Sequence, residues 1–90
     1  MSKRVEGRVA IVTGAASGIG EASAIRLAEE GASVICADID LEGSTKTATA
    51  IENAGGRAKA FAIDISDSKK CDELVEMTVS TYGSVDILVN

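Results

Sequence analysis

Four short hydrophobic runs recur along the chain, and a more polar segment with helical periodicity separates each run from the next. The runs cover residues 9–12, 34–37, 60–63 and 87–89. Each run is continuously apolar rather than alternating, which is typical of strands buried on both faces of a helix-covered sheet. Strand starts at positions 8, 33, 58 and 86 are 25, 25 and 28 residues apart. Each interval therefore has room for one helix.

Every interval contains one helical stripe, and a glycine follows it as a stop signal. The predicted helices cover residues 20–28, about 42–54 and about 66–82, and the glycines after them are Gly31, Gly55 and Gly83. Ser66 and Asp67 are both good N-cap residues for the third helix. On the second helix, Ser44, Ala48 and Ile51 share one face. The predicted buried stripe of the third helix consists of Cys71, Leu74, Val75, Thr78 and Tyr82.

The resulting order is β-α-β-α-β-α-β. Such alternation predicts an α/β fold, a Rossmann-like doubly wound parallel sheet with right-handed crossovers and helices on both faces. With four strands and three helices, this sheet would be incomplete. A length of 90 residues allows at most one domain.

Composition narrows the class of protein. The chain has 46% hydrophobic residues, a net charge of −5, one tyrosine, one phenylalanine and no tryptophan. This composition is globular, and it lacks both the positive charge and the aromatic platforms that nucleic-acid binding needs. Because the sequence has no histidine, it offers neither a Ser-His-Asp triad nor a His-ligated zinc site.

No segment predicts export or membrane insertion. Residues 1–8 include basic side chains, but no apolar region typical of a signal peptide follows them. No run reaches the roughly 18 apolar residues of a membrane span. Cys36 and Cys71 do not form a Cys-x-x-Cys pair, and we expect two reduced thiols that pack as small core residues. The predicted location is the cytoplasm.

A glycine-rich loop links the first predicted strand to the first predicted helix. It reads Thr-Gly-Ala-Ala-Ser-Gly-Ile-Gly over residues 13–20. We expect Gly14 to allow a tight turn, Gly18 to let a diphosphate approach the backbone amides, and Gly20 to let the helix pack closely on the sheet. Free amides and the helix dipole would bind the diphosphate without a lysine. The alternative is a glycine-rich turn needed only for helix–strand packing.

Asp38 directly follows the second hydrophobic run, 18 positions after Gly20. A carboxylate there can accept hydrogen bonds from the ribose hydroxyls of a dinucleotide, and the alternative is a surface aspartate at a strand end. The same charge would repel a 2′-phosphate by up to about 4 kcal/mol at an effective dielectric near 20. No lysine or arginine stands at positions 13–20 or 37–41 to offset this repulsion. We therefore predict NAD rather than NADP.

Asp64 closes the third hydrophobic run and precedes Ile65. Ligands of doubly wound sheets lie beyond the carboxyl ends of the strands, so this carboxylate could accept a hydrogen bond from an exocyclic amine. It could equally form the turn before the third helix. The sequence favours neither role over the other.

Taken together, these motifs resemble the short-chain dehydrogenases/reductases over essentially all 90 residues. The loop at residues 13–20 is similar to the family's Thr-Gly-x-x-x-Gly-x-Gly motif. Residues 34–38 look like its second strand with the NAD-selecting Asp, and Asp64-Ile65 looks like its adenine-contacting pair. Residues 86–90, Asp-Ile-Leu-Val-Asn, are similar to the strand that leads into its Asn-Asn-Ala-Gly motif.

The resemblance implies a role for each matching residue. The residues implied to bind the cofactor are Gly14, Ser17, Gly18, Ile19, Gly20, Asp38, Asp64, Ile65 and Asn90. Ser17 and the Ile19 amide would contact the diphosphate, and Asn90 would lie beside the adenosine half. Thr13 would hydrogen-bond to keep the loop against the fourth strand.

The chain departs from the family pattern where the family's chemistry resides. Family members are much longer, and their chemistry depends on a Ser, a Tyr-x-x-x-Lys pair and a further Asn beyond the fourth strand. Here the single tyrosine, Tyr82, is followed four positions later by Asp86, so we interpret it as a helix-end residue. No catalytic residue is predicted. Residues 1–90 are expected to be the N-terminal part of one NAD-binding Rossmann domain, with the catalytic part absent.

The resemblance implies that the complete parent transfers a hydride between NAD and a small alcohol or ketone, and that it is a homo-oligomer. We expect the 90 residues alone to be inactive, weakly stable, and able to hold at most the adenosine-diphosphate half of NAD, with no partner among nucleic acids or membranes. One alternative is a non-catalytic dinucleotide-binding module. Another is a ketoreductase of the 3-oxoacyl-acyl-carrier-protein type, which usually uses NADPH.

Overall fold

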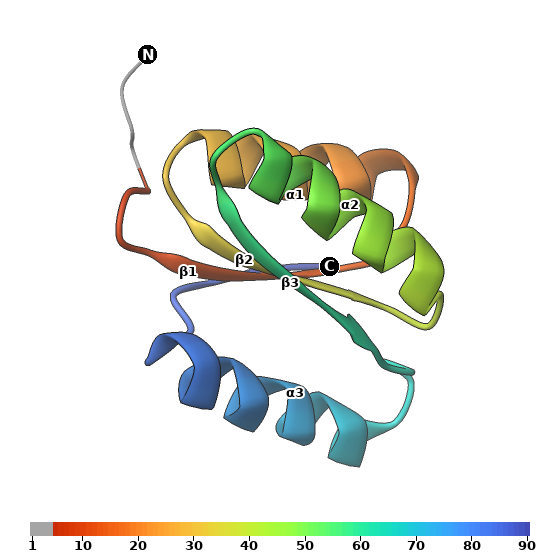
Figure 1. Ribbon diagram of the computed structural model, residues 1–90. Coiled ribbons are helices and arrows are strands. Elements are labelled where there is room, and N and C mark those ends of the chain that lie inside the picture. The colour runs from red at the N-terminus through yellow and green to blue at the C-terminus, as the bar shows by residue number, and fades with distance from the viewer. Residues whose placement is uncertain (1–4) are drawn as a thin grey trace.

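The computed structural model describes residues 5–90. It shows a four-stranded parallel sheet with helices on both faces (Figure 1). The elements are β1 (Val9–Thr13), α1 (Gly18–Glu29), β2 (Ser33–Asp38), α2 (Leu41–Asn53), β3 (Arg57–Ala62), α3 (Ser68–Tyr82) and β4 (Ile87–Val89). The predicted alternation and the Rossmann-like doubly wound fold are confirmed. The prediction about a signal peptide concerns residues 1–8, of which the first four lie outside the described residues.

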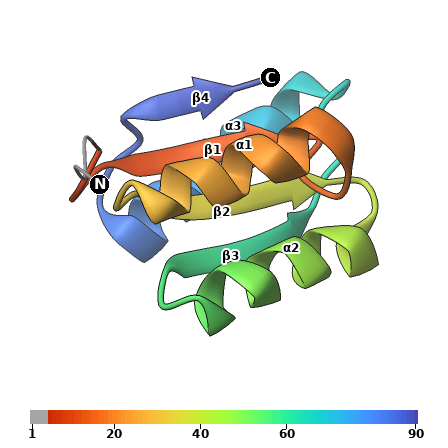
Figure 2. The same cartoon turned by 90° about the horizontal axis from the view of Figure 1, so that it is seen from above.

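The direction of the crossovers decides which face each helix covers. The strand order is β3-β2-β1-β4, so the chain moves one way across the sheet from β1 to β3 and then returns past β1 to reach β4. Right-handed crossovers place helices on opposite faces when the direction of travel reverses. Accordingly, α1 and α2 lie on one face and α3 on the other (Figure 1), and the strand order is visible from above in Figure 2.

The two central strands carry the core. All five residues of β1 are buried, and so are the four middle residues of β2. Their side chains alternate between two clusters. Val12 and Cys36 face the α1–α2 layer, whereas Ile11 and Ile35 pack with Leu74 of α3 on the other side. Burial on both faces is therefore confirmed for these two strands.

The same expectation is wrong for β3 and β4, which form the edges of the sheet. In β3 only Ala58 is buried, and in β4 Leu88 is 59% exposed. The physical reason is that α3 packs mainly against the central strands, so one face of each edge strand stays uncovered. A hydrophobic run in the sequence does not reveal whether its strand will lie at the centre or at an edge.

Helix termini follow the expected capping chemistry. Asp67 is the N-cap of α3, and its side chain accepts a hydrogen bond from the Lys69 amide at 2.9 Å. Asp40 caps α2 in the same way through the Gly43 amide at 3.0 Å. Gly83 ends α3 in the left-handed conformation, at φ 92°. These local signals place each helix close to its predicted range.

Two expectations about individual side chains in α3 need correction. Val75 is exposed rather than part of the buried stripe, which consists of Leu74 and Thr78. Cys71 is half-buried at the start of the helix and not a core residue, whereas Cys36 is buried in the core as expected. Both cysteines are free. Burial raises the pKa of the Cys36 thiol to about 11, so it stays protonated at neutral pH.

Candidate nucleotide-binding site

The carboxyl ends of the first three strands meet at one edge of the sheet. A shallow hollow of about 170 Å³ lies there, lined by Gly14, Asp38, Ile39, Ile63, Asp64 and Ile65. Four of these residues come from three separate motifs that the sequence singled out. The parallel sheet brings them together because strands that run the same way end at the same edge.

Three glycines shape the loop between β1 and α1. Gly14 and Gly18 have positive φ angles of 69° and 59°, a region that residues with a Cβ seldom adopt. At Gly20 an added Cβ would lie 2.6 Å from the carbonyl carbon of Gly14 and would collide with its oxygen. The tightest approach at Gly20 is therefore to the carbonyl of Gly14, directly after β1, while its expected role in packing the helix on the sheet stays a prediction.

The N-terminus of α1 opens onto this loop. Its N-cap residue, Ser17, is in an extended conformation, and its side chain makes no capping hydrogen bond. Ser17 and Gly18 are exposed, and Ile19 is 86% exposed. The first amides of a helix have no partner within the helix. Together with the positive end of the helix dipole, they form an anion-binding arrangement.

Asp38 at the end of β2 is bonded to the loop itself. Its Oδ2 accepts a hydrogen bond from the Ala16 amide at 3.1 Å, and its Oδ1 accepts one from the Asp40 amide at 3.0 Å. Each carboxylate oxygen has a further acceptor direction, so these bonds leave room for ribose hydroxyls. The structure places this carboxylate beside the glycine loop, and the ribose contact itself stays a prediction.

Thr47 of α2 is a contact that the sequence analysis missed. The residue is 1% exposed, and its hydroxyl donates a hydrogen bond to the Ala15 carbonyl at 2.8 Å. The available signal was its position on the face shared with Ser44 and Ile51, where a buried hydroxyl needs an acceptor. The Ser44 hydroxyl, on the same face, is also buried and has no hydrogen-bond partner among residues 5–90.

Thr13 joins the start of the loop to the fourth strand. Its hydroxyl lies 3.2 Å from the Val89 carbonyl and 3.0 Å from Oδ1 of Asn90. This contact confirms the role that the family resemblance implied for Thr13. The side chain of Asn90 therefore lies at the same edge of the sheet as the glycine loop, while its contact with a nucleotide stays a prediction.

Asp64 forms the turn before α3. Its Oδ1 accepts hydrogen bonds from the Ser66 hydroxyl at 2.6 Å and the Ser66 amide at 3.0 Å. These two donors lower the pKa of the exposed Asp64 carboxyl below its ordinary value. Ile65 next to it is 47% exposed. Asp64 therefore has the turn-forming role, one of the two that the sequence allowed. Both of these hydrogen bonds use Oδ1, so the turn does not prevent Oδ2 from contacting a ligand.

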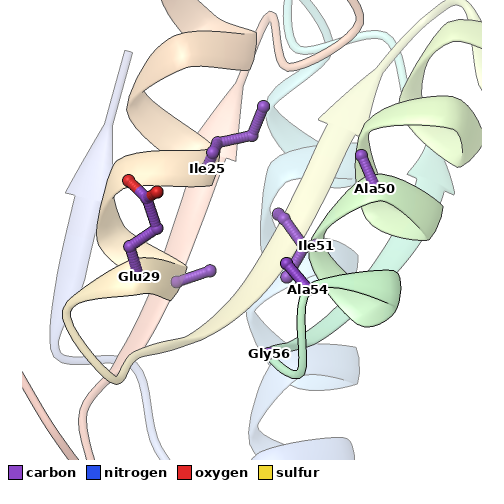
Figure 3. Close-up of a pocket in the computed structure, with 7 residues that line it drawn as sticks. Ile25, Glu29, Ala50, Ile51, Ala54 and Gly56 are labelled. Atoms are coloured by element: carbon purple, nitrogen blue, oxygen red, sulfur yellow. The ribbon is translucent and has the colours of Figure 1, made fainter.

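A second hollow lies between α1 and α2 (Figure 3), and it does not match a nucleotide site. Its volume is about 80 Å³, less than half of the 170 Å³ of the hollow beside Asp38 and Asp64. The lining is mostly apolar, with Ile25, Ala50, Ile51 and Ala54 around one charged residue, Glu29. These residues come from the C-terminal halves of both helices, away from the glycine loop.

Tyr82 is the last residue of α3 and packs half-buried against the Ile11–Leu74 cluster. Burial raises the pKa of its hydroxyl. Its position confirms the interpretation as a helix-end residue.

Within residues 5–90, no group of three acidic or cysteine side chains could hold a metal ion. None of the helices among these residues has the length and apolar character that a bilayer span requires.

The fold and the groups at this edge of the sheet are those of a Rossmann-like α/β unit. The chain belongs to the short chain dehydrogenase family, which it matches over residues 8–90. It is 40% identical to the 3-oxoacyl-[acyl-carrier-protein] reductase FabG of Thermotoga maritima over 97% of this chain and 35% of that protein. It is 45% identical to galactitol 2-dehydrogenase of Agrobacterium fabrum over 97% of this chain and 33% of that protein.

A solved structure gives the same likeness in three dimensions. A 7 alpha-hydroxysteroid dehydrogenase complexed with NADH and 7-oxo glycochenodeoxycholic acid superposes with a TM-score of 0.95 and 39% identity. The match covers 99% of this chain and 35% of that one. The chain thus spans about a third of the length of the relatives it matches.

Proposed function

We propose that residues 1–90 form the N-terminal, nucleotide-binding part of a single NAD-binding Rossmann domain in an oxidoreductase that transfers a hydride between NAD and an alcohol or carbonyl carbon. The observation that carries the proposal is one edge of the sheet. There the open N-terminus of α1, the Asp38 carboxylate and the hollow beside Asp64 lie together. The relatives described above are dehydrogenases and reductases, which supports the reaction class.

Each group at this edge has a chemical task in the proposal. The first amides of α1 and the Ser17 hydroxyl would bind the diphosphate. The Asp38 carboxylate would accept from the ribose hydroxyls, and the exposed side chain of Ile65 would lie against the adenine. Asp64 and Asn90 would supply polar contacts to the adenosine. In the complete enzyme, NAD held by these residues would supply or receive the hydride at its nicotinamide ring.

The charge of Asp38 favours NAD over NADP in this arrangement. A 2′-phosphate would lie next to this half-buried carboxylate, and two like charges at about 4 Å repel by up to about 4 kcal/mol at an effective dielectric near 20. Residues 13–20 and 37–41 contain no lysine or arginine to neutralise the phosphate. Removal of this carboxylate should therefore raise NADP binding relative to NAD binding.

A second candidate is a ketoreductase of the FabG type, which the 40% identity to the Thermotoga maritima protein favours. Such an enzyme usually uses NADPH, so Asp38 argues against it. The two candidates differ in the preferred nucleotide and in the substrate.

In both candidates, the chemistry needs a Tyr-x-x-x-Lys pair, which these 90 residues do not contain. The chain alone should therefore give no turnover. A homo-oligomeric parent and a cytoplasmic location stay predictions.

A titration of NAD and NADP into the isotope-labelled 90-residue chain, followed by NMR, tests the binding proposal. We expect NAD to bind no tighter than the high micromolar range, with amide shifts at residues 14–20 and 38. NADP should bind at least about tenfold more weakly. Asp38→Ser should bring the dissociation constants of NAD and NADP closer together. It also removes the hydrogen bond to the Ala16 amide, but that loss should weaken binding of both nucleotides alike. Asp72→Ser, an exposed change on α3, is the matched control.

Amide shifts confined to other parts of the sheet, or equal binding of the two nucleotides, would contradict the proposal. Sequencing the coding region past the codon for Asn90 separates the enzyme from a non-catalytic binding module. A Ser followed by Tyr-x-x-x-Lys within roughly the next hundred codons is the expected result for an oxidoreductase. A continuous reading frame without them would support the binding module instead.

A further inference from the structure

One peptide group of the glycine loop is held from both sides. The carbonyl of Ala15 accepts the hydroxyl of Thr47 at 2.8 Å, and the amide of Ala16, which belongs to the same peptide group, donates to Asp38 at 3.1 Å. One anchor comes from α2 and the other from β2. A rigid peptide plane bonded at its oxygen and at its nitrogen cannot rotate without breaking one of the two bonds.

The Thr47 bond is buried and therefore hard to replace. Thr47 is a buried residue, so water cannot substitute for its hydroxyl at the Ala15 carbonyl. The hydroxyl also lies 3.3 Å from the Gly43 carbonyl in its own helix. Because a hydroxyl has one proton, the shorter contact to Ala15 is the stronger hydrogen bond. Removal of the hydroxyl would leave a buried acceptor without a donor.

α2 reaches the loop because its first turn has no side chain at the point of contact. A Cβ built on Gly43 would lie 2.7 Å from the Cβ of Ala16, which is closer than two methyl groups can approach. Gly43 therefore permits α2 to lie directly against the loop. One turn further along, Thr47 extends from the same face to the Ala15 carbonyl.

We propose that Thr47 is a positioning residue for the diphosphate loop. By fixing the Ala15–Ala16 peptide group, its hydroxyl sets the direction of the amides that follow at the start of α1, which are the groups proposed above to bind the diphosphate. This inference rests on the proposed function. It also gives Asp38 a second task, since the carboxylate that would bind the ribose orients the diphosphate loop through the same peptide group.

The anchors act on one rigid unit, so their effects should not be additive. Loss of either bond frees the peptide group to rotate. Loss of the second bond then weakens ligand binding by a smaller factor than it would on its own. Residues that share a hydrogen-bond network show such coupling in double-mutant cycles. The pair Asp38→Ala and Thr47→Val should therefore weaken binding of ADP-ribose by less than the product of the two single effects.

The test compares three variants of the 90-residue chain. Thr47→Val removes the hydroxyl at almost constant volume, and Thr47→Ser restores it. Thr78→Val is the matched control, because Thr78 is also a buried helical threonine but its hydroxyl donates within its own helix, to the Leu74 carbonyl at 2.8 Å. Two quantities are measured: the hydrogen-exchange rate of the Ala16 amide without ligand, and the dissociation constant of ADP-ribose.

We expect Thr47→Val to weaken ADP-ribose binding about tenfold and to speed exchange of the Ala16 amide by a similar factor. Thr47→Ser should stay within about threefold of the wild type in both measurements, and Thr78→Val should leave both unchanged. If the wild-type chain does not bind ADP-ribose, the proposed function fails, and the exchange rate alone decides whether Thr47 orders the loop.

Several results would overturn the role of Thr47. One is a Thr47→Val variant that binds ADP-ribose as the wild type does, or whose Ala16 amide exchanges at the wild-type rate. Another is a failure of Thr47→Ser to restore binding. Loss of the folded state in Thr47→Val but not in Thr78→Val, judged by circular dichroism, would assign Thr47 to the overall fold instead.

Discussion

Replacement of Gly20 by alanine tests the geometry of the glycine loop through the sign of a stability change. Two effects oppose each other. Gly20 lies in the first turn of α1, and alanine in place of glycine inside a helix gains roughly 0.5–1 kcal/mol from backbone entropy. The added Cβ, however, would lie 2.6 Å from the Gly14 carbonyl carbon and 3.2 Å from the Ala15 nitrogen. Ordinary contacts between non-bonded heavy atoms are about 3.5–4.0 Å.

The steric cost should exceed the gain in helix propensity, because the loop cannot move aside easily. The amide of Ala15 donates to the Ala37 carbonyl at 3.3 Å, and its carbonyl is bonded to Thr47. Overpacking a well-packed site typically costs about 1–3 kcal/mol. The expected net result for Gly20→Ala is a loss of roughly 1–2 kcal/mol in the free energy of unfolding.

Urea denaturation followed by far-UV circular dichroism measures this change. Ala22→Gly is the control for helix propensity, because Ala22 is exposed on the same helix, and it should lose up to about 1 kcal/mol. Gly18→Ala should also destabilise, but through its positive φ of 59° rather than through a collision. A Gly20→Ala variant as stable as the wild type, or more stable, would refute the close approach between Gly20 and Gly14.

Three further predictions concern titratable and capping groups. At pH 8 iodoacetamide should modify Cys71 in the folded chain and Cys36 only after unfolding, because burial raises the pKa of Cys36 to about 11. Mass spectrometry of the peptides identifies the modified cysteine. The lowered pKa of Asp64 means that its carboxylate adds stability above the unfolded value of 3.8, and that this stability is lost as pH falls through the folded pKa. Ser66→Ala should move that pKa up toward 3.8 in an NMR titration. Asp86→Ala removes the acceptor that the first amide of β1 uses at 2.8 Å, so it should cost about 1–2 kcal/mol in urea unfolding, and an unchanged midpoint would contradict that contact.

Elements were predictable where their signals are local. The hydrophobic runs and helical stripes recur at intervals that match the strands and helices, and each predicted strand start lies within one residue of the observed one. Asp67 could be expected as an N-cap and Gly83 as a stop because capping depends on a few neighbouring residues. Whether a strand lies at the centre or the edge of the sheet depends on distant segments, and the exposure of Leu88 was accordingly missed.

The candidate site was predictable in its parts but not in its connections. The loop glycines and Asp38 follow from spacing after strands, and the contact from Thr13 to the fourth strand followed from the family resemblance. Nothing local reveals that Thr47 lies against Ala15, 32 positions away. Such contacts exist only after α2 has packed on the sheet.

The sequence by itself determined the repeating strand–helix pattern through the order of hydrophobic and polar residues, and the capped helix ends and the glycine loop through single residues, because each depends on the conformations open to a short segment. Only the tertiary structure decided which groups of that loop are fixed. The right-handed crossovers bring the end of β2 and the buried face of α2 to the same peptide group. The directions of backbone amides, on which any diphosphate contact depends, are therefore a property of the packed sheet and helices rather than of the glycine motif alone.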